Sequence, residues 1–285
     1  MVGINTKIRN KKIDDKRSNN TFNAKIIIAA HKKYNMPSDD IYLPLHVGRE
    51  VKQDLGYIGD NIGDNISLKN PSYCELTGLY WAWKNLKCDY LGIAHYRRHF
   101  SVKSYWFRFK HTTMECILTS EELNSLIPRY KILVPQKRRY YIESLHSHYE
   151  HTHYKEHLDI TREIILQVYP DYLNEYDKVM KQSYGHMFNM YIMEKELSDL
   201  YCEWLFNVLF ELEKRVDSSE LSDFQGRFYG RVSEILFNVW LMHQCSLGCE
   251  YKEIPYIHIE KINWYKKGRA FLSAKLKSKK YEGGF

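Results

Sequence analysis

Three short apolar runs, separated by segments with helical periodicity, constrain the fold more than any other feature of the chain. The runs cover residues 25–30 (KIIIAA), 90–94 (YLGIA) and 131–135 (KILVP). Each has the length and apolar content typical of a buried parallel strand. The order strand, helix, strand, helix, strand predicts an α/β fold with a mostly parallel central sheet flanked by helices.

Two helix-start signals lie between these runs. Asn70-Pro71 precedes a helix that we expect to continue to residue 86, because proline is favoured in the first turn, where its missing N–H costs nothing. Thr119 and Glu122 have the spacing of a capping box, which predicts a short helix after residue 119. Periodicity in the second half predicts longer helices over residues 159–169, 196–215 and 228–243.

Two segments have less regular patterns. Residues 35–70 are rich in glycine and contain Asp-Asn pairs, so we expect a long irregular insertion of the kind that forms binding loops. Residues 186–193 (HMFNMYIM) predict a strand that leads into the helix over 196–215. We therefore expect the C-terminal half of the chain to be mainly helical.

Charge and composition limit the class of protein. The 285 residues include 42 Lys and Arg against 35 Asp and Glu, and the net charge of +7 favours acidic partners such as sugar nucleotides, phospholipid headgroups or nucleic acid. No apolar run approaches the roughly 18–20 residues of a membrane-spanning helix. Residues 1–23 lack the apolar stretch of a secretion signal, so we expect a cytoplasmic protein. The six cysteines form no CxxC pair, which favours free thiols over a structural zinc site.

The strongest candidate for chemistry is the sequence His95-Tyr96-Arg97-Arg98, directly after the second apolar run. Open α/β sheets bind their ligands at the carboxyl ends of parallel strands. Two adjacent guanidiniums at such a position favour an anionic ligand, because arginine binds phosphate oxygens in bidentate fashion. Side chains alternate along a strand, so we expect only one of the two arginines to face the ligand. The alternative is a strand end that emerges into solvent and pairs with acidic residues.

Other polar residues are candidates by position. His31, after the first apolar run, would contact a base or phosphate, or else is a structural histidine. Glu75 would pair with Arg97 or bind a ribose, with an exposed helical acid as the alternative. Asn189 interrupts an apolar run and needs a partner, either backbone or a ligand hydroxyl. Glu234 is a candidate general base if it is buried, and otherwise a surface acid.

Two further clusters stand out in the second half. The segment 146–157 (HSHYEHTHYKEH) contains five histidines, of which His153 and His157 are spaced to share a metal ion on one helix face. We prefer a polar, partly exposed segment with one functional histidine. Hydrogen-bond donors near the start of the helix over 228–243 suit an anion; they are Gln225, Arg227, Tyr229 and Arg231.

Several common motifs are absent from the sequence. It contains no Walker loop, GxGxxG, HExxH or GxSxG, so interpretations as a P-loop NTPase, a dinucleotide-dependent dehydrogenase, a zincin or an α/β-hydrolase lose their usual support. No DxD pair stands near the end of a predicted strand.

Several blocks of the sequence resemble a bacterial family first catalogued as a domain of unknown function (DUF4422). Its members occur among capsular and exopolysaccharide gene products and are regarded as glycosyltransferases. The most specific blocks are KNPSYCELTGLYWAWKN (69–85) and DYLGIAHYRRHF (89–100). Weaker blocks are KIIIAAHKKY (25–34), NMYIMEKELSDLYCEWLFNVLFELE (189–213) and GRVSEILFNVW (230–240).

The resemblance implies transfer of a sugar from a UDP-sugar onto a lipid-linked oligosaccharide in capsular or exopolysaccharide synthesis, with galactofuranose or another hexose as the sugar. It implies a GT-A-like domain over residues 25–250, in which 25–140 hold the nucleotide sugar and 141–250 the acceptor. Ordinary GT-A enzymes hold a divalent metal on a DxD motif. The arginines of the HYRR block are an alternative source of positive charge, so dependence on Mn or Mg stays open.

Together with the resemblance, the candidate residues form a working site in which an arginine offsets the diphosphate charge and a carboxylate deprotonates the acceptor hydroxyl. The catalytic candidates are Glu234, Arg97 and Asp159, with Glu234 preferred as the base. The donor-binding candidates are His31, Tyr34, Asn70, Glu75, His95, Tyr96, Arg97 and Arg98. The acceptor-binding candidates are His153, His186, Asn189 and Arg227. We assign no residue as a metal ligand.

Outside this domain we expect a flexible basic arm over residues 1–24 and a basic aromatic tail over 251–285. The tail predicts peripheral contact with the anionic inner face of the plasma membrane, or else is a solvated basic end. Two other classes remain as alternatives, a non-catalytic scaffold and a nucleic-acid-binding protein. We expect no nucleic-acid partner, because the aromatic residues lie mainly on helix faces at core spacing.

Overall fold

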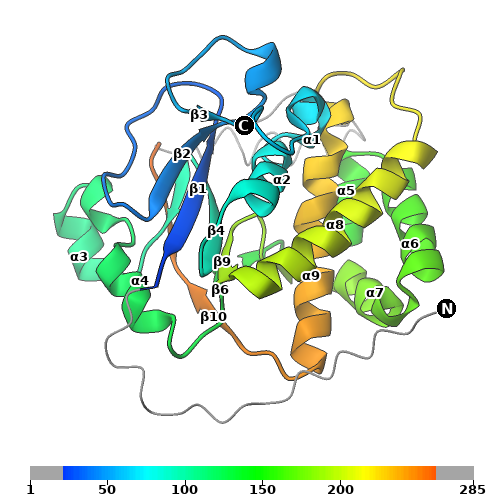
Figure 1. The fold of residues 1–285 in the computed structure, drawn as a ribbon. Coiled ribbons are helices and arrows are strands. Elements are labelled where there is room, and N and C mark those ends of the chain that lie inside the picture. The colour runs from blue at the N-terminus through cyan, green and yellow to red at the C-terminus, as the bar shows by residue number, and fades with distance from the viewer. Residues whose placement is uncertain (1–21, 261–285) are drawn as a thin grey trace.

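The structure, a computed structural model, describes residues 22–260 and is built around one twisted mixed sheet (Figure 1). Its main row of strands has the order β10-β6-β9-β4-β1-β2-β3. The strands of this row are β1 (Ala24–Ala30), β2 (Tyr42–His46), β3 (Ile58–Gly59), β4 (Tyr90–His95), β6 (Ile132–Pro135), β9 (Tyr191–Glu194) and β10 (Tyr251–Ile254). β5 (Arg98–Phe100) pairs with β4 and with β11 (Tyr256–His258), and β7 (Arg138–Arg139) pairs with β8 (Tyr184–Gly185).

The direction of the strands confirms the expected sheet. β1 pairs in parallel with β2 and β4, β2 with β3, and β6 with β10. β9 lies between β4 and β6 and is antiparallel to both. Within this row, every strand except β9 therefore runs in the same direction, and the α/β class with a mostly parallel sheet is confirmed.

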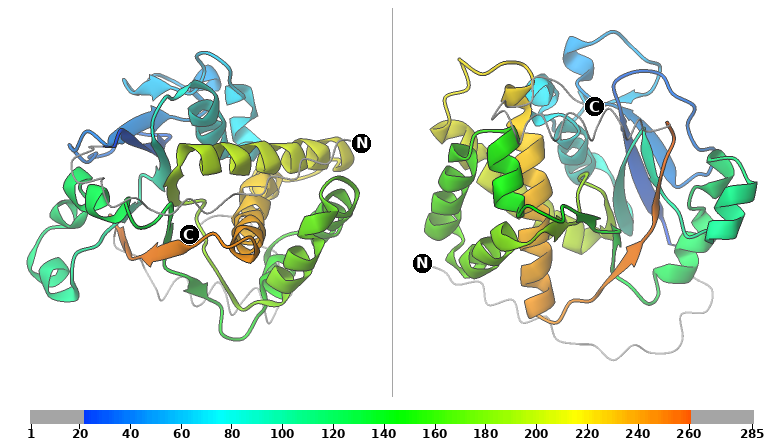
Figure 2. Two further views of the ribbon diagram at one scale, coloured as in Figure 1. Left: turned by 60° about the horizontal axis from the view of Figure 1, so that its bottom comes forward. Right: turned by 180° about the vertical axis from the view of Figure 1, so that it is seen from behind.

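Helices cover the sheet and make up most of the C-terminal half (Figure 2). The helices of the first half are α1 (Asn70–Tyr73), α2 (Leu76–Asn85), α3 (Tyr105–Lys110) and α4 (Ser120–Leu126). Those of the second half are α5 (Leu145–Thr152), α6 (Glu156–Val168), α7 (Leu173–Lys181), α8 (Lys195–Arg215) and α9 (Phe228–Ser246). The predicted capping box is present, since Thr119 Oγ1 accepts the N–H of Glu122 and the Glu122 carboxylate accepts the N–H of Thr119.

Alternation along the strands divides the core into two clusters. In β1, Ile27 belongs to the cluster formed with α2, α8 and α9, whereas Ile26 and Ile28 belong to the cluster formed with α4. All three side chains are fully buried. Because successive side chains of a strand point to opposite faces, one apolar run covers both sides of the sheet.

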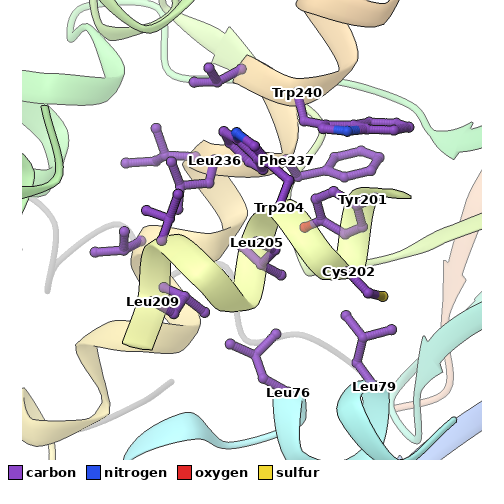
Figure 3. Packing of buried hydrophobic residues seen from close by; sticks show 14 of the residues in the cluster. Leu76, Leu79, Tyr201, Cys202, Trp204, Leu205, Leu209, Leu236, Phe237 and Trp240 are labelled. Atoms are coloured by element: carbon purple, nitrogen blue, oxygen red, sulfur yellow. The ribbon is translucent and has the colours of Figure 1, made fainter. Parts of the chain in front are cut away.

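The larger cluster fixes the elements that carry the candidate site. α8 lies between α2 and α9, and its buried leucines and aromatic residues contact both helices (Figure 3). Leu76 and Leu79 face it from α2, and Phe237 and Trp240 from α9. Burying a side chain of this size stabilises a fold by about 1.5–3 kcal/mol. The start of α2 and the middle of α9 are thus held in fixed positions through α8.

The predicted single helix from residue 70 to 86 is wrong at one point. Cys74 has φ 54°, and it separates α1 from α2. The Asn70 side chain holds this break, because its amide donates to the Cys74 carbonyl oxygen at 2.7 Å and to Thr77 Oγ1 at 3.1 Å. The local hydrogen bonds of asparagine thus replace continuation of the helix.

The segment 35–70 is not wholly irregular, because it contains β2 and β3. Pro44 concealed β2, since proline is rare within paired strands. β3 pairs only with Leu45 and His46, so Pro44 lies where β2 has β1 on one side and no described strand on the other. An edge position of this kind tolerates the missing N–H.

The predicted strand over 186–193 is correct only in its second half. β9 begins at Tyr191, and Phe188 and Asn189 before it have φ values of 79° and 51°. The Asn238 side chain holds the start of this segment, accepting from the N–H of His186 at 2.7 Å and donating to its carbonyl oxygen at 3.0 Å. Side chains of α9 therefore satisfy backbone groups that a longer strand would pair.

The described chain forms strands beyond residue 250. Residues that we assigned to the tail form β10 and β11, and β10 completes one edge of the sheet. The remainder of the tail (261–285) and the basic arm up to residue 21 lie outside the described residues. Within residues 22–260, no helix has the length and apolar character needed to cross a membrane.

Candidate functional site

The candidate site lies at the carboxyl ends of the parallel strands, which we call the upper edge of the sheet. β1, β2 and β4 are parallel, so the residues that follow them, His31, Val47 and Tyr96, leave the sheet at the same edge. β9 runs in the opposite direction, and the segment 186–190 that precedes it therefore approaches this same edge. Residues from both halves of the chain therefore meet at the carboxyl ends of the parallel strands, which is where open α/β sheets bind their ligands.

The first group of side chains surrounds the turn between β4 and β5. The Tyr34 ring stacks on Tyr96 with 4.1 Å between ring centroids, and the His31 ring meets Tyr96 edge-on at 5.0 Å. Arg97 Nε lies 3.1 Å from Glu260 Oε2, and the Tyr34 hydroxyl donates to Glu260 Oε1 at 3.3 Å. Tyr96 is buried, whereas His31 and the Arg97–Glu260 pair are open to solvent.

Several cationic side chains, including Arg97, lie near His31. Partial burial of the ring and the nearby charges of Lys52, Lys32, Arg97 and Arg227 together lower the pKa of His31 to about 4. The His31 ring is therefore neutral at neutral pH. We call this part of the site the rim; it consists of His31, Tyr34, Lys52, Tyr96, Arg97 and Arg227.

The second group joins the start of α2 to α9 through the segment before β9. Asn189 Nδ2 donates to Glu75 Oε1 at 2.8 Å and to the Gly230 carbonyl oxygen at 3.0 Å. Asn189 Oδ1 accepts from the Ser233 hydroxyl at 2.8 Å. The carboxamide is buried and its hydrogen-bonding groups are satisfied, so it fixes the Glu75 carboxylate relative to α9.

Glu234 lies beside this network. Its side chain is 10% exposed, and its Oε1 is 3.5 Å from Arg231 Nη1, whose side chain is 48% exposed. Burial raises the pKa of Glu234 and the neighbouring Glu75 raises it further, while Arg231 and Arg98 oppose the shift. A carboxylate with a raised pKa beside cations is a common property of catalytic acids and bases.

Arg98 differs from Arg97 in its surroundings. Its guanidinium packs 4.2 Å from the centroid of the Phe188 ring. Burial lowers the pKa of Arg98, and Glu234 and Glu75 act in the opposite direction. Among residues 22–260, no carboxylate oxygen lies within 4.0 Å of Arg98, so its charge has no direct ion pair. We call Glu75, Arg98, Asn189, Arg231 and Glu234 the carboxylate centre.

Cys74 connects the rim to the carboxylate centre. Its Sγ accepts from Arg227 Nε at 3.0 Å, and the next residue is Glu75. Burial raises the pKa of the Cys74 thiol and Glu75 raises it further, whereas Arg227 opposes the shift. The thiol thus stays protonated and positions Arg227 at the rim.

His95 and Asn70 hold residues of the rim through hydrogen bonds. His95 Nδ1 accepts the N–H of Arg97 at 3.3 Å, and burial together with Arg98 and Arg97 lowers the pKa of His95. The ring is thus neutral with its proton on Nε2, and it shapes the turn that carries both arginines. Asn70 is buried and accepts from Lys52 Nζ. A Cβ on Gly48 would collide with Asn70 Oδ1, so glycine is needed there for this contact.

Three predicted site residues have other surroundings. His186 Nδ1 donates to the Pro135 carbonyl oxygen at 2.7 Å, and His153 Nδ1 lies 2.9 Å from Gln225 Oε1 in a buried position. Both rings therefore have hydrogen-bond partners within the protein. Asp159 is half-exposed on α6 and pairs with Lys155 at 2.8 Å. α6 lies at the far side of the helical half from the strand ends that form the site (Figure 1).

The histidine-rich segment forms α5 and the start of α6. Glu143, which is 6% exposed, contacts two of its rings, with 2.9 Å to His148 Nδ1 and 2.9 Å to His151 Nδ1. His157 stacks on Phe228 at 3.9 Å and belongs to the helical packing. Within residues 22–260, no three His, Cys, Asp or Glu side chains are placed to hold a metal ion together.

The sequence pattern did not indicate Lys52 or Cys74 as site residues, and it indicated Arg231 only as a donor for an anion. Lys52 follows β2, and the end of that strand would have indicated it if Pro44 had not concealed the strand. Arg231 was recognised only as a donor near the start of a helix, because its spacing to Glu234 also suits a surface ion pair. Cys74 stood within a predicted helix, where its positive φ was not visible.

Two surface hollows lie elsewhere on the protein. One, of about 470 Å³, is lined by Asn23, Leu86, Lys87, Cys88, Asp89 and Lys195 at the opposite end of β4. The other, of about 590 Å³, lies between α6 and α7 and includes Asp159 and Asp177. Neither hollow is lined by a residue of the rim or of the carboxylate centre.

Comparison with known proteins agrees with this architecture. A solved structure described as the WbbM bifunctional glycosyltransferase in its apo form matches with a TM-score of 0.76 and 29% sequence identity, covering 84% of this chain and 46% of that one. The chain thus spans less than half the length of that protein, and its GT-A-like fold class is confirmed. A search of curated proteins found no match. The family model described as a domain of unknown function, DUF4422, matches residues 25–245, and the chain belongs to that family.

Proposed function

We propose that the protein is a glycosyltransferase that uses a nucleotide-sugar donor. The observation that carries the proposal is the carboxylate centre, in which Arg98 has no direct ion pair and Glu234 has a raised pKa, both beside the carboxyl ends of parallel strands. The likeness to the WbbM glycosyltransferase over 84% of the chain supports the same reaction class.

The rim suits the nucleoside diphosphate of the donor. Tyr34 and Tyr96 form a stacked aromatic pair beside which a base can stack, and Lys52, Arg97 and Arg227 supply positive charge for phosphate oxygens. A UDP-sugar is our first candidate. A divalent ion would offset the negative charge of the diphosphate. Among the described residues, no cluster of His, Cys, Asp or Glu side chains is placed to hold such an ion. We therefore propose that the cations of the rim offset the diphosphate charge.

The chemical step follows from the carboxylate centre. Glu234 accepts the proton of the acceptor hydroxyl, and the acceptor oxygen attacks the anomeric carbon of the sugar. The bond from that carbon to the diphosphate breaks, and the nucleoside diphosphate leaves with the bonding electrons. Arg98 stabilises the charge that develops on the leaving oxygen, as a preorganised donor does in an oxyanion site. Asn189 holds Glu75 in place beside the reacting groups.

We propose a lipid-linked oligosaccharide of capsular or exopolysaccharide synthesis as the acceptor, with galactofuranose or another hexose as the sugar transferred. The family resemblance supports this assignment. Arg227, Asn189, His153 and His186 remain acceptor-side candidates. Arg227 lies at the rim, where it would also contact the donor phosphates, whereas Asn189, His153 and His186 have hydrogen-bond partners within the protein and would act by positioning neighbouring groups.

The test begins with thermal unfolding in the presence of nucleotide sugars, with and without manganese. Binding to the folded state raises the midpoint by mass action, so the screen identifies the donor and its dependence on metal. Transfer or hydrolysis of the labelled donor then tests for an enzyme. Binding without turnover would favour a scaffold. Salt-dependent retention on a nucleic-acid column, without a response to any nucleotide sugar, would overturn the proposal in favour of nucleic-acid binding.

A further inference from the structure

Helix α3 exposes three aromatic side chains side by side. Tyr105 is 68% exposed, Trp106 71% and Phe109 76%, and none of the six residues of α3 is buried. α3 lies at the outer edge of the sheet half in every view (Figures 1 and 2). Exposed aromatic residues gathered in this way, unlike single exposed leucines, mark a binding surface.

The structure holds these rings in an ordered arrangement. Ser104 Oγ accepts the N–H of Phe107 at 3.2 Å and caps the helix, and Phe107 stacks on His111 at 3.7 Å. Lys103 pairs with Glu122 of α4 at 2.6 Å, which ties the start of α3 to the fold. The aromatic rings are therefore presented by a fixed helix and have little conformational freedom to lose on binding.

The charged side chains of α3 itself are positive, while Lys103 before it is paired with Glu122 of α4. The sequence contains no Asp or Glu between Asp89 and Glu115, while Lys103, Arg108 and Lys110 lie on or next to α3. Aromatic and basic side chains together are typical of helices that lie on an anionic membrane surface. Protein interfaces are depleted in lysine, so the exposed Lys110 favours a lipid partner over a protein partner.

We propose that α3 and its flanks bind the surface of an anionic lipid bilayer. Trp106 and Phe109 enter the boundary between headgroups and acyl chains, and Arg108 and Lys110 contact the anionic headgroups. The proposal concerns α3 and its flanks alone, since residues 261–285 lie outside the described part of the chain. Its readout is binding to vesicles without substrate, so its outcome does not depend on the proposed sugar transfer.

The test is flotation of the full chain with vesicles of phosphatidylcholine, with and without phosphatidylglycerol. We expect binding only to the anionic vesicles. The variant Trp106→Ser/Phe109→Ser should bind at least about tenfold more weakly, because it loses apolar area that is buried in the bilayer. Arg108→Gln should bind about fivefold more weakly, since one basic side chain near an anionic surface contributes about 1 kcal/mol.

The matched control is Leu166→Ser/Leu247→Ser, which removes two exposed apolar side chains away from α3. It should bind as the unchanged protein does, and all variants should keep the thermal midpoint, because the changed apolar side chains are exposed and Arg108 is partly exposed. Unaltered flotation of the α3 variant would overturn the proposal and place any binding elsewhere, including in residues 261–285. Equal losses in the α3 variant and the control would also overturn it. If the α3 variant abolished self-association but left flotation intact, the surface would be an interface between copies of the chain.

Discussion

The rim and the carboxylate centre contain adjacent residues, Arg97 and Arg98, but differ in electrostatic character: the rim is cationic, and the carboxylate centre contains charges of both signs. At the rim, Arg97 pairs with Glu260 in a solvent-exposed position. One residue further along the chain, Arg98 is less exposed, packs on Phe188, and faces Glu234 and Glu75 without a direct ion pair. An exposed ion pair contributes roughly 0–1 kcal/mol, whereas charges in a poorly solvated site interact more strongly.

The comparison indicates a division of roles between the two arginines. The cationic side chains of the rim are accessible to solvent, and Glu260 partly offsets the charge of Arg97. This arrangement suits the binding of a charged donor. The groups of the carboxylate centre are fixed by hydrogen bonds from the segment before β9 and from α9, which suits a reaction that needs positioned charges. The difference also revises our expectation from the sequence, because Arg98 rather than Arg97 now becomes the first candidate for stabilising the leaving group.

The largest expected effect is at Glu234. Glu234→Gln should lower the rate of sugar transfer at saturating donor and acceptor by about 10²–10⁴-fold, because it removes the general base. In the unchanged protein the rate should fall as pH decreases through the raised pKa of Glu234, since only the ionised form accepts a proton. The control is Glu203→Gln, which makes the same change at an exposed position of α8. If Glu234→Gln turned over as fast as this control, Glu234 would have no part in the reaction.

The second prediction compares the two arginines directly. Arg98→Gln should reduce turnover on the order of a hundredfold, as loss of a preorganised donor does. Arg97→Gln should mainly raise KM for the donor, by about fivefold or less, because it removes an exposed charge. Arg129→Gln, on the surface after α4, controls for the loss of one positive charge. Equal effects on turnover from Arg97 and Arg98 would contradict the division of roles.

A smaller effect is expected at the aromatic pair of the rim. Tyr34→Ala should weaken donor binding about tenfold and leave turnover at saturating donor nearly unchanged, since a stacked base contributes about 1–3 kcal/mol. Tyr34→Phe keeps the ring and loses the hydrogen bond to Glu260, so its donor affinity should stay near that of the unchanged protein. Equilibrium titration with UDP measures both, and the reverse order of affinities would exclude stacking at Tyr34.

The smallest effect concerns buried histidines that lie outside both regions. Burial lowers the pKa of His99 and of His153 to about 4. Between pH 6.5 and 4 the unfolded chain binds more protons at these sites than the folded chain, so stability should fall as pH decreases through this range. We expect about 1–3 kcal/mol for each ring, and denaturant unfolding at several pH values measures it. His153→Asn should lose less stability on acidification, and identical pH profiles for both proteins would contradict this assignment.

The sequence predicted the parts of the molecule in which local pattern and tertiary packing agree. The apolar runs became β1, β4 and β6, and the periodic segments became α8 and α9. Prediction failed where one side chain overrides the pattern of its neighbours. Pro44 lies inside a paired strand, Asn70 ends a helix at Cys74, and Asn238 holds the segment before β9 away from the sheet.

The candidate site was predictable in part for the same reason. His31, Tyr34, Tyr96 and Arg97 were expected together because the ends of parallel strands meet at one edge, and they form the rim. The contact of Glu75 with Asn189 joins residues 114 positions apart, and no local pattern indicates it. His153 and His186 were assigned by residue type, and their hydrogen bonds within the protein become visible only in three dimensions.

The reversed strand β9 has a mechanical consequence. It begins two residues after Asn189 and leads directly into α8 at Lys195. It is paired with β4 on one side and with β6 on the other. Met190 and the four residues of β9 therefore connect the carboxamide that holds Glu75 to the longest helix of the described chain. Any displacement of α8 would be transmitted along this strand, so the packing beneath α8 sets the alignment of the reacting groups at a distance.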